Sequence, residues 1–333
     1  MVAASGVAPA GAGPRPGEGL GASPEQILRR LEWTVIRRLD GLLQGDYRTL
    51  FQGFGLDLAD LRQYQVGDDV RTIDWNVTAR MAEPYVRRYL EDREITAHFL
   101  LDLTRSVEFG TVTTQKRDLA VDLVGVLARL LTRRGNRVGA LLYRGGPPRR
   151  IPASGGRVQV LRLLHEMGLP GPSTPAGGTD LRLLLESALR AVRRRSLIFV
   201  VSDFVSSPGW DGPLGLLARR HEVLAVRVFD PREVDLPDLG PVYFEDAETG
   251  EQMFLDTSDP AFRVRFTEAA RKREQETAAR LRASGVAAFS LSTEGDLVED
   301  LLRFAALRKQ QKHAPAAFHG SSSSRPRLEL VKR

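Results

Sequence analysis

Apolar runs of strand length alternate with stretches of helical period from residue 96 to residue 307. The runs predict six strands, at residues 96–101, 137–143, near 150–152, 197–202, 223–229 and 286–291. Helices are predicted where apolar residues recur every three or four positions, at residues 119–131, 160–167, 180–192, 259–283 and 296–307. Alternating strands and helices are typical of an α/β fold. We therefore expect a doubly wound, mostly parallel sheet with helices on both faces.

The segments on either side of this pattern have a different composition. Residues 1–23 are rich in Ala, Gly and Pro, which predicts a disordered leader. Residues 24–95 predict a helix at 24–43, with Ser23 as its N-cap, followed by a small β-rich segment. Residues 309–333 predict a disordered basic tail, so the α/β domain is expected to cover residues 96–308.

One stretch inside the α/β domain departs from the alternation. Residues 241–256 predict a β-hairpin that turns at Glu248-Thr249-Gly250. We expect this hairpin to pair with the β-rich segment before residue 96, so that two separated pieces of the chain form one small accessory subdomain.

Composition narrows the class of protein. The chain has no cysteine, which excludes disulfides and thiolate metal sites and favours a reducing compartment. Its apolar runs are shorter than the roughly 18–20 residues that span a membrane. The N-terminus lacks the basic and apolar regions of a signal peptide. We expect a soluble, cytoplasmic protein.

The positive charge is concentrated at one end of the chain. The formal net charge is +6, and residues 309–333 contain six Lys or Arg and one Glu, so they contribute 6 − 1 = +5. The remaining residues contribute only +1, so the body of the protein is nearly neutral and its sequence shows no obvious basic stripe for nucleic acid. Nucleic-acid binding is therefore expected only through the tail.

Carboxylate and hydroxyl side chains follow the predicted strands where those strands end. Asp102, Thr104 and Ser106 come after the strand at 96–101, Asp203 comes after the strand at 197–202, and Thr179 precedes a helix. Oxygen ligands of this kind suit a hard cation such as Mg²⁺ or Mn²⁺. Taken singly, each has a structural alternative, because Ser and Thr also cap helices and turns and Asp also forms strand-end turns.

Two patterns resemble known proteins. The order Asp-x-Thr-x-Ser, then Thr, then Asp resembles the metal-ion-dependent adhesion site of von Willebrand factor A (vWA) domains. A longer string resembles the signature of a bacterial family of vWA-like proteins catalogued as domain of unknown function fifty-eight. Its matching residues are Arg62, Tyr64, Gly67, Asp68, Asp69, Arg71, Ile73, Asp74, Trp75, Ala79 and Arg80. On spacing alone, the string also fits a small β-rich segment with local Arg–Asp pairs.

The resemblance implies an arrangement for the site. The vWA strand order would place the first and fourth predicted strands side by side where the strand order reverses, which brings Asp102 and Asp203 together. Two carboxylates about 4 Å apart repel by about 4 kcal/mol at an effective dielectric near 20, and a cation would remove that cost. The ligands that the family pattern implies, through hydroxyls or carboxylates, are Asp102, Thr104, Ser106, Thr179 and Asp203.

The same resemblance implies a non-catalytic protein-interaction function. The metal would keep an open coordination position for a carboxylate of another protein. The implied partner is an AAA+ ATPase of the MoxR type, acting with this protein in chaperone-like assembly or maturation of a client protein.

Common enzyme motifs are absent from the sequence. It contains no G-x-x-x-x-G-K-[ST] phosphate loop and no G-x-S-x-G nucleophile turn, and its five histidines show no paired metal-ligand spacing. Two alternatives stay open. One is a nucleic-acid-associated protein anchored by its basic tail. The other is a Mg²⁺-dependent phosphohydrolase with an aspartyl intermediate at Asp102, although Thr104 stands where such phosphatases usually carry a second Asp.

Overall fold

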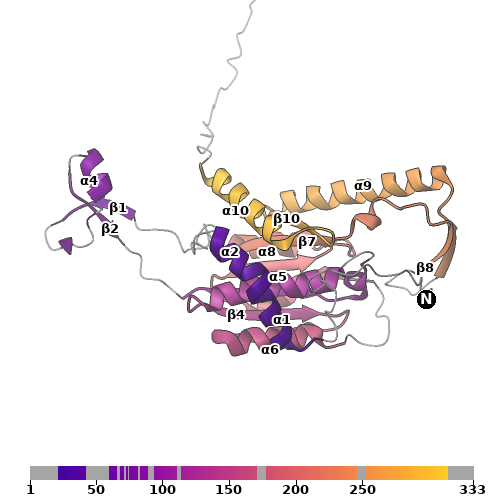
Figure 1. The fold of residues 1–333 in the computed structure, drawn as a ribbon, viewed down its shortest axis with the longest axis horizontal. Helices are drawn as coiled ribbons and strands as arrows, with labels where there is room; N and C mark the ends of the chain where they lie inside the picture. Colours follow the sequence, from indigo (N-terminus) through magenta and orange to yellow (C-terminus); the bar gives the residue numbers. More distant parts are fainter. Residues whose placement is uncertain are drawn as a thin grey trace, which may run out of the picture.

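A six-stranded sheet crosses the main body of the molecule (Figure 1). The structure is a computed structural model that describes residues 22–42, 60–65, 68–70, 73, 75–81, 83–88, 94–110, 114–170, 178–245 and 252–313. In spatial order the strands are β10 (Ala287–Ser292), β7 (Glu222–Phe229), β6 (Leu197–Ser202), β3 (Thr96–Asp102), β4 (Arg137–Tyr143) and β5 (Arg149–Ser154). All neighbouring pairs are parallel except β4 and β5. The predicted doubly wound α/β fold is confirmed.

Helices cover both faces of this sheet. One face carries α1 (Pro24–Leu31), η1 (Glu32–Ile36), α2 (Arg37–Leu42), α5 (Lys116–Thr132), α6 (Gly156–Gly168) and α10 (Leu297–His313). The other face carries α7 (Leu181–Ala191), α8 (Asp211–Arg220) and the end of α9 (Pro260–Ala283). Successive residues of a strand point to opposite faces, so Phe99 and Leu101 join the first core and Leu100 joins the second. The central strands are therefore apolar on both sides, as their continuous hydrophobic runs predicted.

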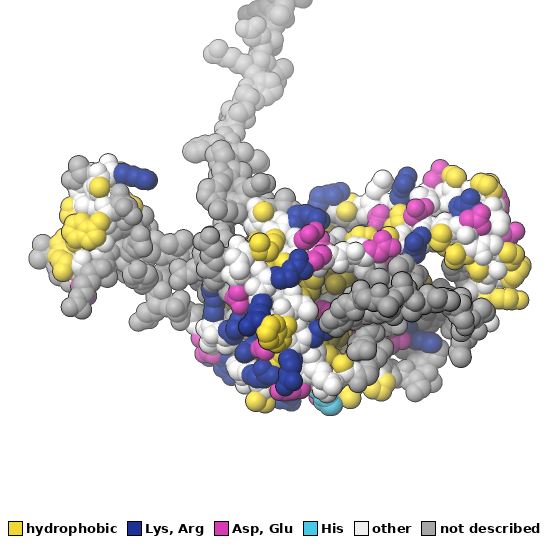
Figure 2. Space-filling model, viewed as in Figure 1, with side chains coloured by type: hydrophobic (Ala, Val, Ile, Leu, Met, Phe, Trp, Pro, Cys, Tyr) yellow, Lys and Arg dark blue, Asp and Glu magenta, His cyan; other side chains and the backbone are white. Residues whose placement is uncertain are grey.

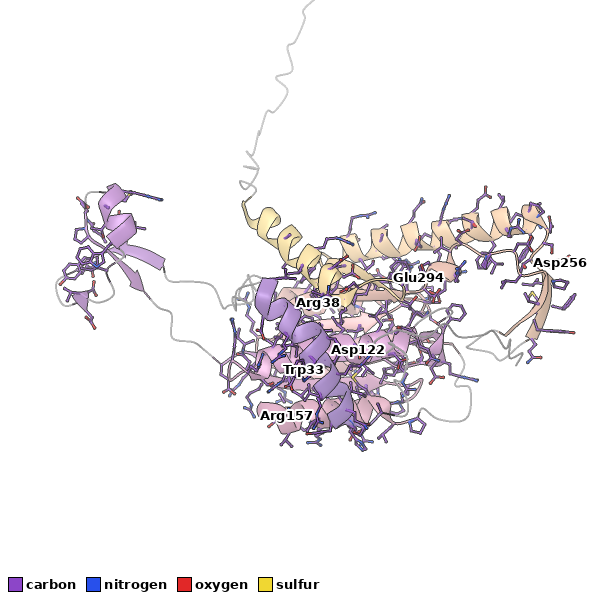
Figure 3. All side chains as sticks on the ribbon, viewed as in Figure 1. Trp33, Arg38, Asp122, Arg157, Asp256 and Glu294 are labelled. Carbon is purple, nitrogen blue, oxygen red and sulfur yellow. The ribbon has the colours of Figure 1, made fainter. Side chains whose placement is uncertain are left out.

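The N-terminal helical segment is tied to the main domain by packing and ion pairs. Ser23 and Gln26 form a capping box at its start, and Leu28 and Leu39 are fully buried against the domain. Arg38 lies 2.8 Å from Asp296, and Arg157 lies 2.9 Å from Glu25 in the first turn of α1. Figure 3 labels both arginines. The predicted helix at 24–43 is confirmed as far as Leu42, where the described segment ends.

Two small antiparallel sheets lie outside the central sheet. One joins β1 (Asp60–Gln63) to β2 (Tyr85–Arg88), with α4 (Trp75–Met81) between them in the chain. The other joins β8 (Pro241–Glu245) to β9 (Gln252–Asp256), which confirms the predicted hairpin, while its turn lies outside the described residues. The hairpin carries exposed Tyr243, Met253 and Phe254 at one end of the molecule (Figure 2).

The expected pairing between these two sheets is wrong. Each is a separate two-stranded sheet, and Figure 1 shows them at opposite ends of the molecule. Each strand pairs with its own neighbour in sequence, because closing a short loop costs less entropy than joining segments some 180 residues apart. The accessory subdomain built from both pieces therefore does not form.

Three helices differ from the prediction. Helix α4 lies in a segment that was predicted to be β-rich. Helix α8 was not predicted, because Gly212, Pro213 and Gly215 interrupt its apolar period. Helix α10 continues to His313, six residues past the predicted end, so the first residues assigned to the tail are helical. The predicted disordered leader (all but its last residues) and the rest of the tail lie outside the described residues. None of the helices described is both long enough and apolar enough to cross a membrane.

Candidate metal centre

The strand order reverses between β3 and β6. The chain leaves β3 for β4 on one side and later enters β6 on the other, and both neighbours run parallel to β3. Loops that leave the carboxyl ends of two such strands diverge, and ligands of α/β sheets bind between them. We call this place between β3 and β6 the crevice. Asp102 ends β3, and Asp203 follows β6 directly. The expectation that these two strands lie side by side is confirmed.

The loop after β3 brings its hydroxyls back onto Asp102. Thr104 donates its backbone N–H and its hydroxyl to Oδ1 of Asp102, at 3.1 and 2.7 Å. Oγ1 of Thr104 also lies 3.2 Å from Oγ of Ser106, at the start of the single turn η3 (Arg105–Glu108). Neither hydroxyl caps η3. The alternative that Ser106 only caps the turn after the strand therefore does not explain its contact with Thr104.

Thr179 joins the same cluster from a distant part of the chain. Its hydroxyl donates to Oγ1 of Thr104 at 3.0 Å across 75 positions in sequence. Ser206 and the backbone N–H of Ser207 both bond to its carbonyl oxygen and hold the residue in place. The cap of α7 is Asp180, which accepts from the backbone N–H of Arg182, so capping α7 does not explain Thr179.

The end of β6 supplies Ser202, which the sequence did not predict, and Asp203 follows it directly. Ser202 donates its hydroxyl to Oδ2 of Asp102 at 2.7 Å and accepts the backbone N–H of Phe204 at 2.9 Å. Phe204 has φ of +58°, which costs an L-residue roughly 1–3 kcal/mol, and its ring is buried against Trp210. Oδ1 of Asp203 accepts from the backbone N–H of Val205, so this aspartate does form a strand-end turn.

A second missed residue is Lys116, the first residue of α5. Its ammonium lies 2.9 Å from Oδ2 of Asp203 and 2.6 Å from Oε1 of Glu233, which belongs to the single turn η4 (Pro231–Glu233). Burial pushes the pKa of Lys116 down, but the two carboxylates raise it by more, so it stays charged. A sequence signal did exist: lysine is rare in this chain, with 5 against 43 arginines, and this one starts an apolar helix.

The two aspartates have different electrostatic environments. Burial, and then the negative charge of Asp203, raise the pKa of Asp102 from its ordinary 3.8 to about 6. Hydrogen bonds from Thr104 and Ser202 act in the opposite direction but only in part. The two carboxylates therefore do interact, but Lys116 offsets the charge of Asp203. The repulsion expected from the sequence is thus partly relieved inside the protein.

The donor set fits a hard divalent cation. The hydroxyl of Thr104 lies 3.2 Å from that of Ser106 in the same loop and 3.0 Å from that of Thr179 in a distant loop, and it also bonds to the Asp102 carboxylate. Such mixed neutral and anionic oxygens are the ligands that Mg²⁺ and Mn²⁺ take. Among the residues described, no three His, Asp or Glu side chains gather as a metal site, so metal binding here depends on the hydroxyl oxygens as well. Metal binding by these five predicted residues stays a prediction.

Comparison with known proteins identifies relatives of this chain. A family model described as "Protein of unknown function DUF58" matches residues 60–276. An uncharacterized protein of Mycobacterium tuberculosis strain H37Rv is 41% identical over 284 residues, which cover 85% of this chain and 89% of that protein. An uncharacterized protein of Mycobacterium avium is 38% identical over 162 residues, which cover 48% of this chain and 95% of the relative.

Among solved structures, similarity extends to proteins of low sequence identity. The conserved hypothetical protein BatB from Bacteroides thetaiotaomicron has a TM-score of 0.44 and 14% identity, with 66% of this chain and 99% of that chain covered. An aerotolerance-related membrane protein from Bacteroides fragilis has a TM-score of 0.44 and 16% identity, with 64% and 99% covered.

Proposed function

The chain belongs to the family of proteins of unknown function DUF58, and from this membership and the crevice between β3 and β6 we propose a metal-dependent protein-interaction function without a catalytic step. The observation that carries the proposal is the hydroxyl chain from Thr179 to Thr104 to Asp102. It joins loops that are far apart in sequence at the carboxyl edge of the sheet, next to Asp203.

The residues of the crevice would hold Mg²⁺ or Mn²⁺ as in a vWA adhesion site. Thr104, Ser106 and Thr179 would supply hydroxyl oxygens, and Asp102 and Asp203 would supply carboxylates directly or through water. A divalent cation held mainly by neutral oxygens keeps part of its positive charge, and it attracts a carboxylate from another protein. The chain's own contribution is to hold these oxygens together before the metal arrives.

The partner in this proposal is an AAA+ ATPase of the MoxR type, with which the protein would assist assembly or maturation of a client protein in the cytoplasm. Support comes from the resemblance of the Arg62–Arg80 signature and of the Asp-x-Thr-x-Ser pattern to vWA-like partners of such ATPases. The absence of cysteine agrees with a reducing compartment.

The test is capture of that ATPase on immobilised protein in Mg²⁺ and in EDTA. We expect capture in Mg²⁺ only, and Asp102→Ala should weaken it by about thirtyfold or more, since losing a central charged contact costs at least about 2 kcal/mol. Asp180→Ala is the matched control. It removes a neighbouring carboxylate that caps α7, so it should lower stability by about 1 kcal/mol and keep capture.

Two outcomes would contradict the proposal. Full capture by a folded Asp102→Ala protein would mean that docking occurs elsewhere, and the signature segment around the exposed Trp75 would be tested next. Hydrolysis of p-nitrophenyl phosphate by the wild-type protein, lost in Asp102→Ala, would favour the phosphohydrolase alternative instead.

A further inference from the structure

Lys116 is a fully buried cation that the proposed function does not use. Its exposure is 0%, and its ammonium contacts two carboxylates, from Asp203 and Glu233. The face of Phe109 lies 5.8 Å from the same nitrogen. A compact ammonium fits between two carboxylates in a closed space, whereas the planar guanidinium of arginine requires more room.

The position of Lys116 in its helix is unfavourable for a cation. It is the first residue of α5, where the helix dipole is positive, and Arg117 follows it. Its backbone N–H bonds to the carbonyl of Phe109 at 3.0 Å, so the helix start itself is satisfied without the side chain. The two carboxylates thus hold the ammonium where the helix disfavours it, which points to a role at the crevice rather than in the helix.

Lys116 also occupies one oxygen of a predicted metal ligand. Oδ2 of Asp203 accepts from the ammonium at 2.9 Å, and Oδ1 accepts from the backbone N–H of Val205 at 3.0 Å. Each carboxylate oxygen can accept a second contact, so Asp203 is still able to face a cation. Its negative charge is, however, already paired with the positive charge of Lys116.

We propose that Lys116 is a built-in counter-cation that weakens the hold of the crevice on a divalent cation and makes its retention depend on a carboxylate-bearing ligand. This inference rests on the proposed metal-dependent function. A divalent cation and the charges of Asp102, Asp203 and Lys116 sum to +1, and the partly exposed Glu233, which water screens, offsets that charge only in part. An acidic group from a partner balances that charge, so metal and ligand stabilise each other.

Glu233 affects the same charge balance through its ion pair with Lys116. Its side chain is 31% exposed and lies in the turn that follows β7, while Asp203 is almost fully buried. Removing the charge of Glu233 leaves Lys116 with Asp203 alone and makes the crevice more positive. Removing the charge of Lys116 has the opposite effect. The two substitutions are therefore expected to shift metal affinity in opposite directions.

The experiment is a Mn²⁺ titration followed by the electron paramagnetic resonance signal of free Mn²⁺, on the full chain. The proteins are the wild type, Lys116→Met and Glu233→Gln, each with and without acetate as the carboxylate probe. We expect Lys116→Met to bind Mn²⁺ at least tenfold more tightly and Glu233→Gln severalfold more weakly than the wild type. Acetate should raise Mn²⁺ affinity more in the wild type than in Lys116→Met, because the charge that it balances is larger there.

The outcomes separate this inference from the proposed function. Mn²⁺ binding by the wild type, with unchanged or weaker binding by folded Lys116→Met, would overturn the inference and leave the metal site standing. Should Lys116→Met fail to fold, Glu233→Gln decides, and equal or tighter Mn²⁺ binding by that variant would overturn it. No Mn²⁺ binding by any of the three proteins would overturn the metal-dependent function itself.

Discussion

The two ends of the central strands both bury titratable side chains, but they treat them differently. At the carboxyl end, Asp102 accepts hydrogen bonds on both oxygens, and Asp203 is paired with Lys116. Near the amino end of β3, His98 is buried and its Nδ1 has no hydrogen-bond partner among the residues described. Burial alone therefore does not mark a site. A convergence of partnered oxygens from distant loops does.

The pKa values of the buried groups at the two ends are shifted in opposite directions. Burial, and then the positive charge of Arg150, lower the pKa of His98 to about 4, so it stays neutral at neutral pH. Burial and Asp203 raise the pKa of Asp102 to about 6, so its charge is costly above that pH. At the amino end, packing keeps His98 uncharged. At the carboxyl end, Asp102 carries a charge that needs a partner. The following predictions test this difference, from the largest expected effect to the smallest.

Breaking the buried ion pair should have the largest effect on stability. Asp203→Ala leaves Lys116 with only the partly exposed Glu233, and removing one partner of a buried pair costs about 3–5 kcal/mol. The measurement is urea unfolding in EDTA. Glu186→Ala is the control: it removes the 38% exposed partner of Arg190, which is itself 69% exposed, and the loss should stay below about 1 kcal/mol. Equal losses in the two variants would mean that Lys116 behaves like a surface group.

Neutralising Asp102 should stabilise the protein in EDTA above pH 6. The pKa of Asp102 rises from 3.8 to about 6 on folding, so the stability gained by protonating it is present below 3.8 and is lost as pH rises through 6. Asp102→Asn should therefore be more stable than the wild type at pH 7.5 by as much as about 3 kcal/mol, and the gain should vanish near pH 4. A pH-independent difference between the two proteins would show that Asp102 does not titrate in this range.

The opposite end should show a smaller effect at neutral pH and the opposite pH trend. The pKa of His98 falls from 6.5 to about 4 on folding, so its contribution is present above 6.5 and is lost as pH falls through 4. His98→Leu should change stability by less than about 1 kcal/mol at pH 7.5, because Nδ1 has no partner to lose. Near pH 4 the variant should exceed the wild type by about 3 kcal/mol. A loss of several kcal/mol at pH 7.5 would reveal a bonded, structural histidine.

The sequence predicted the strands of this crevice well, for a local reason. The ends of β4 and β6 match the predicted strand ends, and β3 ends one residue after its predicted end, at Asp102. Burial on both faces makes such a run continuous, and the first polar residue marks where the strand leaves the core. The hydroxyl and carboxylate residues that follow were therefore found without knowledge of the fold.

What the sequence did not predict depends on contacts between distant residues or on backbone shape. Lys116 meets Asp203 and Glu233 across 87 and 117 positions, and Ser202 meets Asp102 across 100. The positive φ of Phe204 has no sequence signal, since a non-glycine residue adopts it only when the surrounding packing requires it. The predicted pairing of the two small antiparallel sheets was wrong, because turn signals predict only which strands close in sequence pair with each other.

Thermal unfolding in Mg²⁺ and in EDTA tests the central claim, that the crevice at Asp102 binds a divalent cation. At about 100 times the dissociation constant, Mg²⁺ should stabilise the folded wild-type protein by about 2.7 kcal/mol. For a domain of this size that shift is roughly 5–10 °C in melting temperature. Asp102→Ala should melt at the same temperature in both solutions. Identical curves for the wild type in Mg²⁺, Mn²⁺ and EDTA would contradict the account.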